Sequence, residues 1–444
     1  MSANKKVCML VVITVISHTV LSYFAYFFPF GMPVFEKINL IADVIQVVAK
    51  EKDLSTRLPM GKQTTLKNNT VKGDFESYKK GDLITDFKLH AGPSLSNFMA
   101  KLQALKKGSK RKVRIAYIGD SMIEGDQISS TLRDSLQAVY GGSGVGYLAI
   151  HTKVGNFRHS AVIKAMGWED TSFKSAGSKN LYLSGHYFGG NGQGVYSDKT
   201  LGAPTQEIVE KALLYAGGSG GSILVNGQLI ALKGRDPINR QVLAKDSSSV
   251  LKLSNSANAR LYGVSFESEY GVIVDNFSFR GVSGSEFRKL DPTFMEAIQK
   301  ANHYDLIILH YGANLIYRPG DNNFEFYDRA INPVLTRFKN SFPDCDFLLI
   351  SAGDMAFRYN GRYRTALGIS ELLVTQALLA KRHQFAFYNL FQSMGGEGTI
   401  IRWANHQPAL AIKDYVHPTE DGSQLIGAKL FKAFQNDYKK LSIQ

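Results

Sequence analysis

The sequence predicts an α/β fold whose mostly parallel sheet is interrupted by a segment of β structure, with a transmembrane helix at the N-terminus. Three observations predict it. Short apolar runs alternate with amphipathic helical patterns in the two flanking parts of the chain, which is typical of a parallel sheet covered by helices on both faces. Over residues 152–268 helical periodicity largely disappears, and short alternating runs separated by Gly, Ser and Asn replace it. Finally, residues 7–30 are apolar over a length that can span a bilayer.

Length and composition set the outer limits. The 444 residues, 44% of them hydrophobic, are enough for more than one domain with a large core. A formal net charge of +14 favours anionic neighbours such as cell-wall polymers, lipid headgroups or nucleic acid. The basic residues are scattered and no nucleic-acid-binding motif is present, so we predict a basic solubilising surface and no nucleic-acid partner. The two cysteines exclude a disulfide framework. No Cys/His spacing suggests zinc, and we expect neither a metal nor a cofactor.

The N-terminal segment is predicted to be a membrane anchor. Residues 7–30 carry no charged side chain if His18 is neutral, and such a run can cross about 30 Å of hydrocarbon as a helix. Bulky aromatic residues end the run and no clear cleavage site follows, which favours an anchor over a cleaved signal peptide. A lysine pair before the run favours a cytoplasmic N-terminus. We therefore expect an inner-membrane transmembrane helix within 1–30 and a tether over 31–80. The remainder then lies in the periplasm or cell exterior, or is secreted if the segment is cleaved.

The next elements bring a serine to a strand-to-helix turn. Residues 94–105 have helical spacing and precede a basic turn. Residues 113–118 are a short, largely apolar strand that ends directly before a Gly-Asp-Ser tripeptide. An amphipathic helix is predicted over 128–140, so the serine of that tripeptide, Ser121, lies on the turn between strand and helix.

Residues 152–268 are predicted to be an inserted β-sandwich domain. Asn226-Gly227 separates two apolar runs and predicts a tight hairpin, because Asn-Gly accepts the positive φ values of a primed turn. Regularly spaced short strands are typical of a sandwich, and further strands are expected over 211–215, 250–253 and 261–266. The insertion leaves the α/β domain in two parts, 81–151 and 269–444.

Strand and helix patterns alternate again after the insertion. Apolar strands are predicted over 272–279, 306–310, 347–351 and 385–388. Helices are predicted between them over 291–300, 323–339 and 369–382. Polar residues follow the carboxyl ends of several of these strands, which is where parallel sheets place their sites.

Four short motifs fall at the strand ends or in the last loop. They are Gly119-Asp120-Ser121, Gly281-Val282-Ser283-Gly284, Gly312-Ala313-Asn314 and Asp414-Tyr415-Val416-His417. Each motif alone is weak, because such short patterns arise often by chance. Their order, their strand-end contexts and their joint occurrence are much harder to explain as coincidence. Together they supply a hydroxyl, an imidazole and a carboxylate, the three groups of a serine hydrolase.

This set of motifs resembles the SGNH (GDSL-type) hydrolase family, which is named for its Ser, Gly, Asn and His. The resemblance covers about residues 81–150 and 270–444. It implies a flavodoxin-like three-layer α/β/α sandwich with a parallel sheet, split by the insertion, and a carboxylic ester hydrolase activity that needs no cofactor.

The resemblance also implies a role for each matching residue. Ser121 is expected to be the nucleophile, with His417 and Asp414 completing a triad, and Ser121, Gly284 and Asn314 forming the oxyanion hole. A serine on a sharp turn can expose its Oγ, although a serine there also suits a helix N-cap. An ordinary loop glycine and a turn asparagine are the corresponding alternatives for Gly284 and Asn314. The gap of three residues lets Asp414 reach His417 Nδ1 and fix its tautomer.

The sequence departs from the family pattern in two places. Met122 follows the serine instead of Leu, and Leu315 follows Asn314 where many members have Asp. The absence of that Asp, the long insertion, the predicted anchor and the context of His417 look more like the bacterial peptidoglycan O-acetylesterase branch. In that branch the inserted module looks like a carbohydrate-binding β-sandwich.

Three further residues are candidates for substrate contact. His310 and Tyr311 lie at a strand end next to Asn314, and Trp403 precedes the last motif. Packing is the simpler role for each of them, although a tryptophan can stack on a sugar ring.

The leading functional hypothesis is a serine esterase that removes O-acetyl groups from an envelope polysaccharide such as peptidoglycan through an acetyl-Ser121 intermediate. A polysaccharide O-acetyltransferase could use the same triad, because exclusion of water decides between the two outcomes. A third alternative is a non-catalytic glycan-binding protein tethered to the membrane. The expected partners are an acetylated polysaccharide and, through the N-terminal helix, the membrane.

Overall fold

The computed structural model describes most of the chain beyond residue 74. Apart from Met9, Thr14 and Ser17, the described ranges are 75–87, 93–152, 157–201, 207–218, 221–255 and 259–442. Contacts divide the chain into two units, 1–71 and 72–444, and the second is described here. The predicted membrane anchor lies outside the described residues. Among those that are described, no helix combines the length and the apolar character needed to span a bilayer.

A five-stranded parallel sheet forms the centre of the α/β part, in the order β13-β1-β14-β15-β18. In chain order this arrangement reads 2-1-3-4-5, the doubly wound order of flavodoxin-like folds. The predicted α/β class with a parallel sheet is confirmed. The chain adds β13 on one side of β1 and β14 on the other. The strand order therefore reverses between β1 and β14, and a crevice is expected beyond their carboxyl ends. The bounds are β1 Lys112–Gly119, β13 Gly271–Ser278, β14 Tyr304–His310, β15 Asp346–Ile350 and β18 Ala386–Tyr388.

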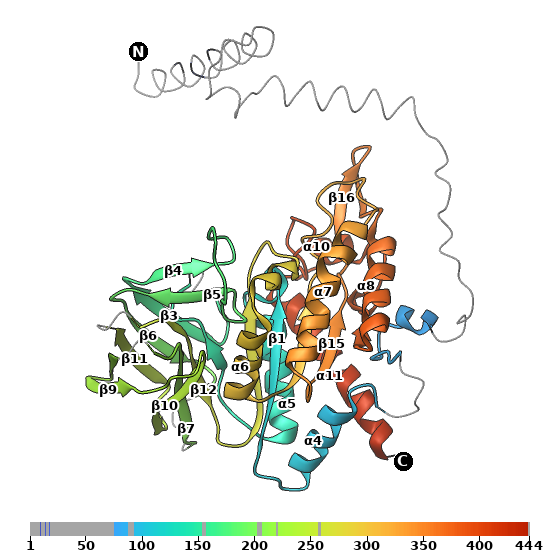
Figure 1. The fold of residues 1–444 in the computed structure, drawn as a ribbon. Coiled ribbons are helices and arrows are strands. Elements are labelled where there is room, and N and C mark those ends of the chain that lie inside the picture. The colour runs from blue at the N-terminus through green and yellow to red at the C-terminus, as the bar shows by residue number, and fades with distance from the viewer. Residues whose placement is uncertain are drawn as a thin grey trace. The chain divides into compact units, whose positions relative to one another are not determined.

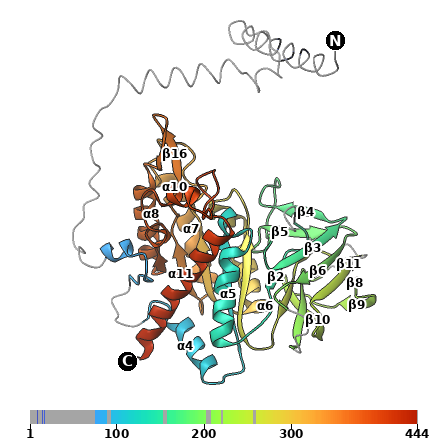
Figure 2. The ribbon, with the colours of Figure 1, turned by 180° about the vertical axis from the view of Figure 1, so that it is seen from behind.

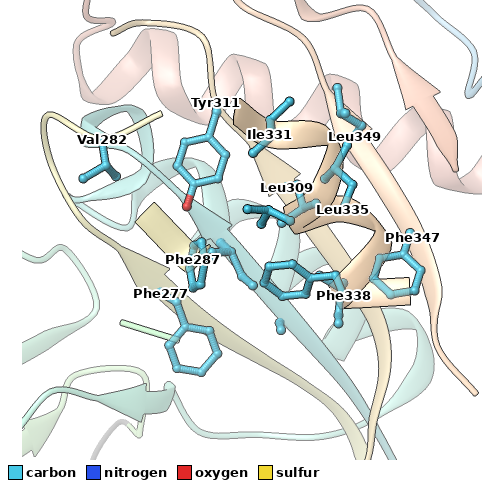
Figure 3. Packing of buried hydrophobic residues seen from close by; sticks show 14 of the residues in the cluster. Phe277, Val282, Phe287, Leu309, Tyr311, Ile331, Leu335, Phe338, Phe347 and Leu349 are labelled. Atoms are coloured by element: carbon cyan, nitrogen blue, oxygen red, sulfur yellow. The ribbon is translucent and has the colours of Figure 1, made fainter. Parts of the chain in front are cut away.

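Helices cover both faces of this sheet (Figures 1 and 2). Side chains alternate along β1, so Ile115 and Tyr117 pack with one set of helices while Ala116 and Ile118 pack with the other. The first set is α4 Ser96–Lys106, α5 Gln127–Tyr140 and α11 Glu420–Lys439. The second set is α6 Pro292–Asn302, α7 Glu325–Ser341 and α8 Ile369–His383. Figure 3 shows part of the second core, in which Phe287 and Phe338 pack edge to face.

Several short elements complete the α/β part. An antiparallel hairpin of β16 Ala356–Tyr359 and β17 Arg362–Thr365 follows β15. The sequence did not predict it, because its strands are short and rich in arginine and tyrosine. The remaining helices are α9 Leu390–Met394, α10 Thr399–Asn405, η1 Phe75–Lys79, η2 Ser121–Ile123, η3 Ser285–Lys289 and η4 Lys440–Ser442.

The β segment between β2 and β12 consists of two antiparallel sheets that enclose a shared apolar cluster. One sheet has the order β10-β7-β12-β5-β4, with β2 beside β12. Its bounds are β2 Gly146–Leu148, β4 Glu169–Ser172, β5 His186–Gly189, β7 Val209–Tyr215, β10 Asn239–Asp246 and β12 Leu261–Glu267. The other has the order β3-β6-β11-β8-β9. Its bounds are β3 Ala161–Met166, β6 Gln193–Asp198, β8 Gly221–Val225, β9 Gln228–Leu232 and β11 Val250–Asn255.

The predicted hairpin lies between β8 and β9. Asn226 and Gly227 form its turn with φ values of 49° and 87°, as a primed turn requires. The β segment begins earlier than predicted, since Gly146 of β2 already pairs with Phe266 of β12.

The end of the predicted tether is folded against the α/β part. Tyr78 of η1 is 6% exposed, and its ring lies 6.4 Å from that of Phe387 on β18. Thr85 then forms an isolated antiparallel bridge with Phe387. Residues 75–80 are therefore packed instead of forming part of the tether, because the aromatic rings of η1 cover the last strand of the sheet.

Candidate active site

The structure brings together the serine, histidine and aspartate that the motifs singled out. Ser121 Oγ lies 2.8 Å from His417 Nε2. On the other side of the ring, His417 Nδ1 lies 2.7 Å from Asp414 Oδ2. Because a carboxylate only accepts hydrogen bonds, Nδ1 carries the hydrogen and Nε2 is left as an acceptor for the serine hydroxyl. The order of these contacts is that of a serine, a base and an orienting acid.

Ser121 is held on the sharp turn at the carboxyl end of β1. Gly119 ends the strand where the backbone carbonyl of His310 would lie 2.7 Å from an added Cβ, so only glycine fits. Asp120 caps η2, and its carboxylate accepts a hydrogen bond of 3.0 Å from the Met122 N–H. The aspartate thus takes the capping role, which leaves the Ser121 hydroxyl free to face His417.

A tight loop holds the acid and the base. The N–H groups of Val416 and His417 donate to Asp414 Oδ1 over 2.9 and 3.0 Å, which leaves Oδ2 for the imidazole. Tyr415 turns the chain with φ of 57°, a left-handed conformation that is uncommon outside glycine and asparagine. The Thr419 hydroxyl then accepts from the Gly422 N–H and begins α11. This loop, residues 414–417, is called the triad loop below.

The triad residues are open to solvent. The His417 side chain is 34% exposed and that of Asp414 is 41% exposed. The imidazole and the carboxylate are therefore accessible from solvent, while Ser121 is half-buried.

Two backbone N–H groups and one amide surround the serine turn. Gly284 has φ of 92°. A Cβ added there would lie 3.0 Å from the Tyr311 ring and 3.2 Å from Ile331, so a side chain would be strained and crowded. Among the described residues, no hydrogen-bond partner is found for the N–H of Ser121 or of Gly284. Both groups are thus able to donate to a bound anion.

Asn314 lies beside these groups, but its amide hydrogens have internal acceptors. Its Nδ2 donates to Asp120 Oδ2 over 3.2 Å and to the Val282 carbonyl over 3.1 Å. The two contacts orient the amide, and one of them must be released or shared before Asn314 can donate to a substrate oxygen.

Asp120 is a site residue whose contribution the sequence did not reveal. Its two carboxylate oxygens join the serine turn to Asn314. The side chain is fully buried, and burial raises its pKa from the ordinary value of 3.8 to about 6. Backbone hydrogen bonds from Met122 and Gly312 and the charge of His417 oppose this rise in the pKa.

The three predicted substrate contacts are buried, and we correct that prediction. His310 is 2% exposed, and its Nδ1 lies 3.1 Å from the Tyr117 hydroxyl. Burial lowers the pKa of His310 to about 4. Tyr311 is 5% exposed in the core beneath Gly284, and Trp403 is 8% exposed in the core of the opposite face. Their apolar or aromatic surface is used for packing, so none of the three lines an open site.

In the part of the chain that the structure describes, no group of three or more His, Cys, Asp and Glu side chains is placed to hold a metal ion.

Comparison with known proteins identifies the fold. No family model matches the sequence, and no curated protein matches it. Among solved structures, a peptidoglycan O-acetylesterase superposes with a TM-score of 0.67 at 20% identity, over 80% of this chain and 99% of that chain. This chain therefore shares the fold of that esterase. A family two carbohydrate esterase from Cellvibrio japonicus matches 63% of this chain and 99% of that chain, at 10% identity and a TM-score of 0.27. That TM-score is too low to support a conclusion.

In this fold the candidate site lies where the strand order predicts it. Ser121 follows β1 and Asn314 follows β14. These two adjacent parallel strands are the ones between which the strand order reverses. Gly284 follows β13 on the other side of β1. The serine turn is therefore flanked by both neighbouring strand ends, an arrangement that open parallel sheets use for ligand sites.

Proposed function

We propose that this protein is a serine esterase of SGNH type that removes O-acetyl groups from an envelope polysaccharide, with peptidoglycan as the first candidate. The observation that carries the proposal is the hydrogen-bonded series Ser121, His417 and Asp414 at the carboxyl end of the central strand. A fold shared with a peptidoglycan O-acetylesterase supports the same reaction class.

The first step is attack of Ser121 on the acetyl carbonyl carbon. As the Oγ–C bond forms, the hydroxyl proton moves to His417 Nε2, and Asp414 stabilises the resulting imidazolium. The carbonyl oxygen becomes an oxyanion. The N–H groups of Ser121 and Gly284 are its donors, joined by Asn314 when that amide exchanges one internal acceptor for the oxyanion.

The sugar leaves first, and acetate is released afterwards. The bond between the carbonyl carbon and the sugar oxygen breaks, and His417 returns its proton to that oxygen, which leaves an acetyl ester on Ser121. Water then attacks this ester while His417 Nε2 accepts its proton. Collapse of the second tetrahedral intermediate returns the proton to Ser121 Oγ and frees acetate, so no metal or cofactor takes part.

Exposure favours hydrolysis over acetyl transfer. With the His417 and Asp414 side chains 34% and 41% exposed, water reaches the position from which it attacks the acetyl-enzyme. A transferase has to keep water from that position, and an open triad is poorly suited to do so.

The net charge supports the choice of polymer, and the N-terminal segment supports the location. A net charge of +14 favours an anionic substrate. An anchor over residues 7–30 would hold the enzyme at the outer face of the inner membrane, within reach of envelope glycans. Membrane tethering and a periplasmic location are parts of this proposal.

Release of acetate from purified O-acetylated peptidoglycan tests the proposal. The wild-type protein is expected to release acetate, and Ser121→Ala to reduce kcat by at least about a thousandfold. A fluorophosphonate is expected to form an adduct at Ser121 in the wild type. Acetate release by Ser121→Ala at the wild-type rate would contradict the proposal, as would a wild-type protein that neither forms the adduct nor cleaves a small acetyl ester. Dominant acetyl-sugar product in the presence of a glycan acceptor would favour transfer instead.

A further inference from the structure

The β16–β17 hairpin, residues 356–365, is attached directly to the triad loop. The Ala356 N–H donates to the Tyr415 carbonyl over 3.0 Å. The rings of Tyr363 and Tyr415 have centroids 4.0 Å apart, with an angle of 32° between their planes. Since Tyr415 stands between Asp414 and His417, the hairpin borders the site at its acid and base side. In Figures 1 and 2 it projects beyond the neighbouring helices near α10.

Hydrogen bonds at both ends of the hairpin fix its position. The Thr365 hydroxyl donates to Asp354 over 2.8 Å and accepts from the Gly398 N–H over 2.7 Å. On the opposite face, the Tyr359 hydroxyl donates to the Pro319 carbonyl over 2.8 Å and accepts from the Leu367 N–H over 3.1 Å. The hairpin is thus a positioned projection, held from both faces.

This projection carries three arginines. Arg358, Arg362 and Arg364 are exposed, and none of them forms an ion pair within the described residues. The one hydrogen bond that these side chains make there runs from Arg358 Nε to the Gly361 carbonyl over 3.2 Å. Like charges gathered on one small element repel one another, and no acidic side chain in the described ranges offsets the repulsion.

The geometry of the arginines suits a chain of carboxylates. Arg362 and Arg364 lie two residues apart on one face of β17, about 7 Å apart along the strand. Arg358 lies on the other face, opposite Tyr363. A guanidinium offers a planar fork of donors that matches a carboxylate. Tyr363, 44% exposed, shares the face of Arg358 and offers an aromatic surface next to the triad loop.

We propose that the β16–β17 hairpin binds carboxylate groups of the acetylated glycan strand whose ester Ser121 attacks. This inference rests on the proposed esterase function for its substrate and names the chemical feature that the substrate carries beside its ester. The arginines hold the polymer, and the triad loop under the same hairpin then receives a neighbouring acetyl group.

The test compares a hairpin variant with a matched control. The hairpin variant is Arg358→Gln, Arg362→Gln and Arg364→Gln combined. The control is Lys107→Gln, Arg329→Gln and Lys432→Gln combined, three exposed cations on helices or directly after one that also lack ion pairs among the described residues.

Binding is measured first, because it does not depend on turnover. Each set of substitutions is placed in the full chain with Ser121→Ala, and co-sedimentation with insoluble O-acetylated peptidoglycan is measured. We expect the hairpin variant to bind at least about tenfold more weakly than the control. Amidation of the polymer's carboxyl groups is expected to weaken binding of the Ser121→Ala parent to a similar degree. Equal binding by hairpin variant and control, or no effect of amidation, overturns the proposal.

Turnover is measured second, with Ser121 intact. The kcat/KM for the glycan, divided by that for a small acetyl ester, is expected to fall at least about tenfold in the hairpin variant and to stay constant in the control. An unchanged ratio in the hairpin variant also overturns the proposal. If the wild type releases no acetate, the esterase function fails while the binding result still decides on the hairpin. Loss of binding to phosphatidylglycerol vesicles, with glycan binding intact, would assign the arginines to a membrane instead.

Discussion

Asp120 shows how one buried carboxylate can organise a site without taking part in proton transfer. Its Oδ1 accepts from the Met122 N–H and sets the turn that presents Ser121, while its Oδ2 accepts from the amide of Asn314. A single side chain therefore ties the nucleophile turn to a candidate oxyanion donor that follows a different strand. Loss of this carboxylate is expected to affect the donor more than the fold.

Asp120→Asn is expected to lower kcat for a small acetyl ester by about a hundredfold, with little change in KM. The new amide can still accept from Met122 N–H, but its own NH₂ group then faces the NH₂ group of Asn314. Two donors cannot satisfy each other, so Asn314 turns away, and the loss of one oxyanion donor has this size. Steady-state kinetics on the small ester measure the effect. A kcat within about twofold of wild type would show that Asp120 does not position Asn314.

The same carboxylate makes a prediction about stability and pH. Its pKa is raised from 3.8 to about 6 in the folded protein, so the folded state binds this proton more tightly than the unfolded state does. The contribution to stability is complete below pH 3.8 and is lost as the pH rises through 6. Relative to Asp120→Asn, the free energy of unfolding of the wild type is expected to fall by about 2 kcal/mol between pH 4 and pH 7. Guanidinium unfolding of both proteins at the two pH values measures the difference, and a parallel response would contradict the prediction.

At the level of elements, the triad loop depends on the neighbouring hairpin. Tyr415 adopts φ of 57°, a conformation that costs a tyrosine on the order of 1 kcal/mol. Its ring packs on Tyr363, and its carbonyl accepts from Ala356. These contacts help to keep the loop in the form that aligns Asp414 with His417.

Tyr363→Ala is expected to reduce kcat for a small acetyl ester by about fivefold, because an aromatic pair of this kind contributes on the order of 1 kcal/mol. Tyr363→Phe keeps the ring and is expected to retain activity within about twofold of the wild type. Kinetics of the two variants measure the effect on a substrate too small to use the arginines. Equal activity of the alanine and phenylalanine variants would contradict a positioning role for the ring.

The elements that could be predicted from the sequence are those with a strong local signal. β1 and β14 are short apolar runs, and α5 has a clear helical period. Asn226-Gly227 is typical of the tight hairpin turn that it forms. The β16–β17 hairpin carries exposed arginine and tyrosine in place of an apolar alternation, so no local pattern indicated it.

Within the site, the motif residues were predictable but their partners were not. Ser121, His417 and Asp414 were found through short motifs and a family resemblance. The bond between Asp120 and Asn314 joins residues from two strand ends and exists only in the assembled sheet. Burial of Trp403 likewise depends on helices that pack over it. A sequence alone does not distinguish an exposed aromatic residue before a site motif from a buried one.

At the level of the whole molecule, buried ion pairs connect the parallel sheet to the β segment. Glu267, at the end of β12, is fully buried and contacts Arg114 over 2.6 Å and Lys112 over 2.9 Å, both on β1. Arg240 of β10 contacts the same carboxylate. Burial lowers the pKa of Lys112 to about 8. Charges removed from water to this extent are stable only while each has its partner, so the two parts of the molecule are expected to unfold together.

Glu267→Gln is expected to lower the free energy of unfolding by about 3–5 kcal/mol, because the cations of Arg114, Lys112 and Arg240 then face each other with a carboxylate missing. Glu269 lies two residues further on and forms an ion pair with Lys245, and its side chain is 57% exposed. Glu269→Gln is therefore expected to change the free energy of unfolding by less than about 1 kcal/mol. Guanidinium unfolding followed by tryptophan fluorescence and by esterase activity measures both variants. Because the network spans both parts, the two signals are expected to fall in one transition in the wild type and in Glu269→Gln. Separate transitions in the wild type, or equal stability of the two variants, would show that the buried network does not join the β segment to the catalytic sheet.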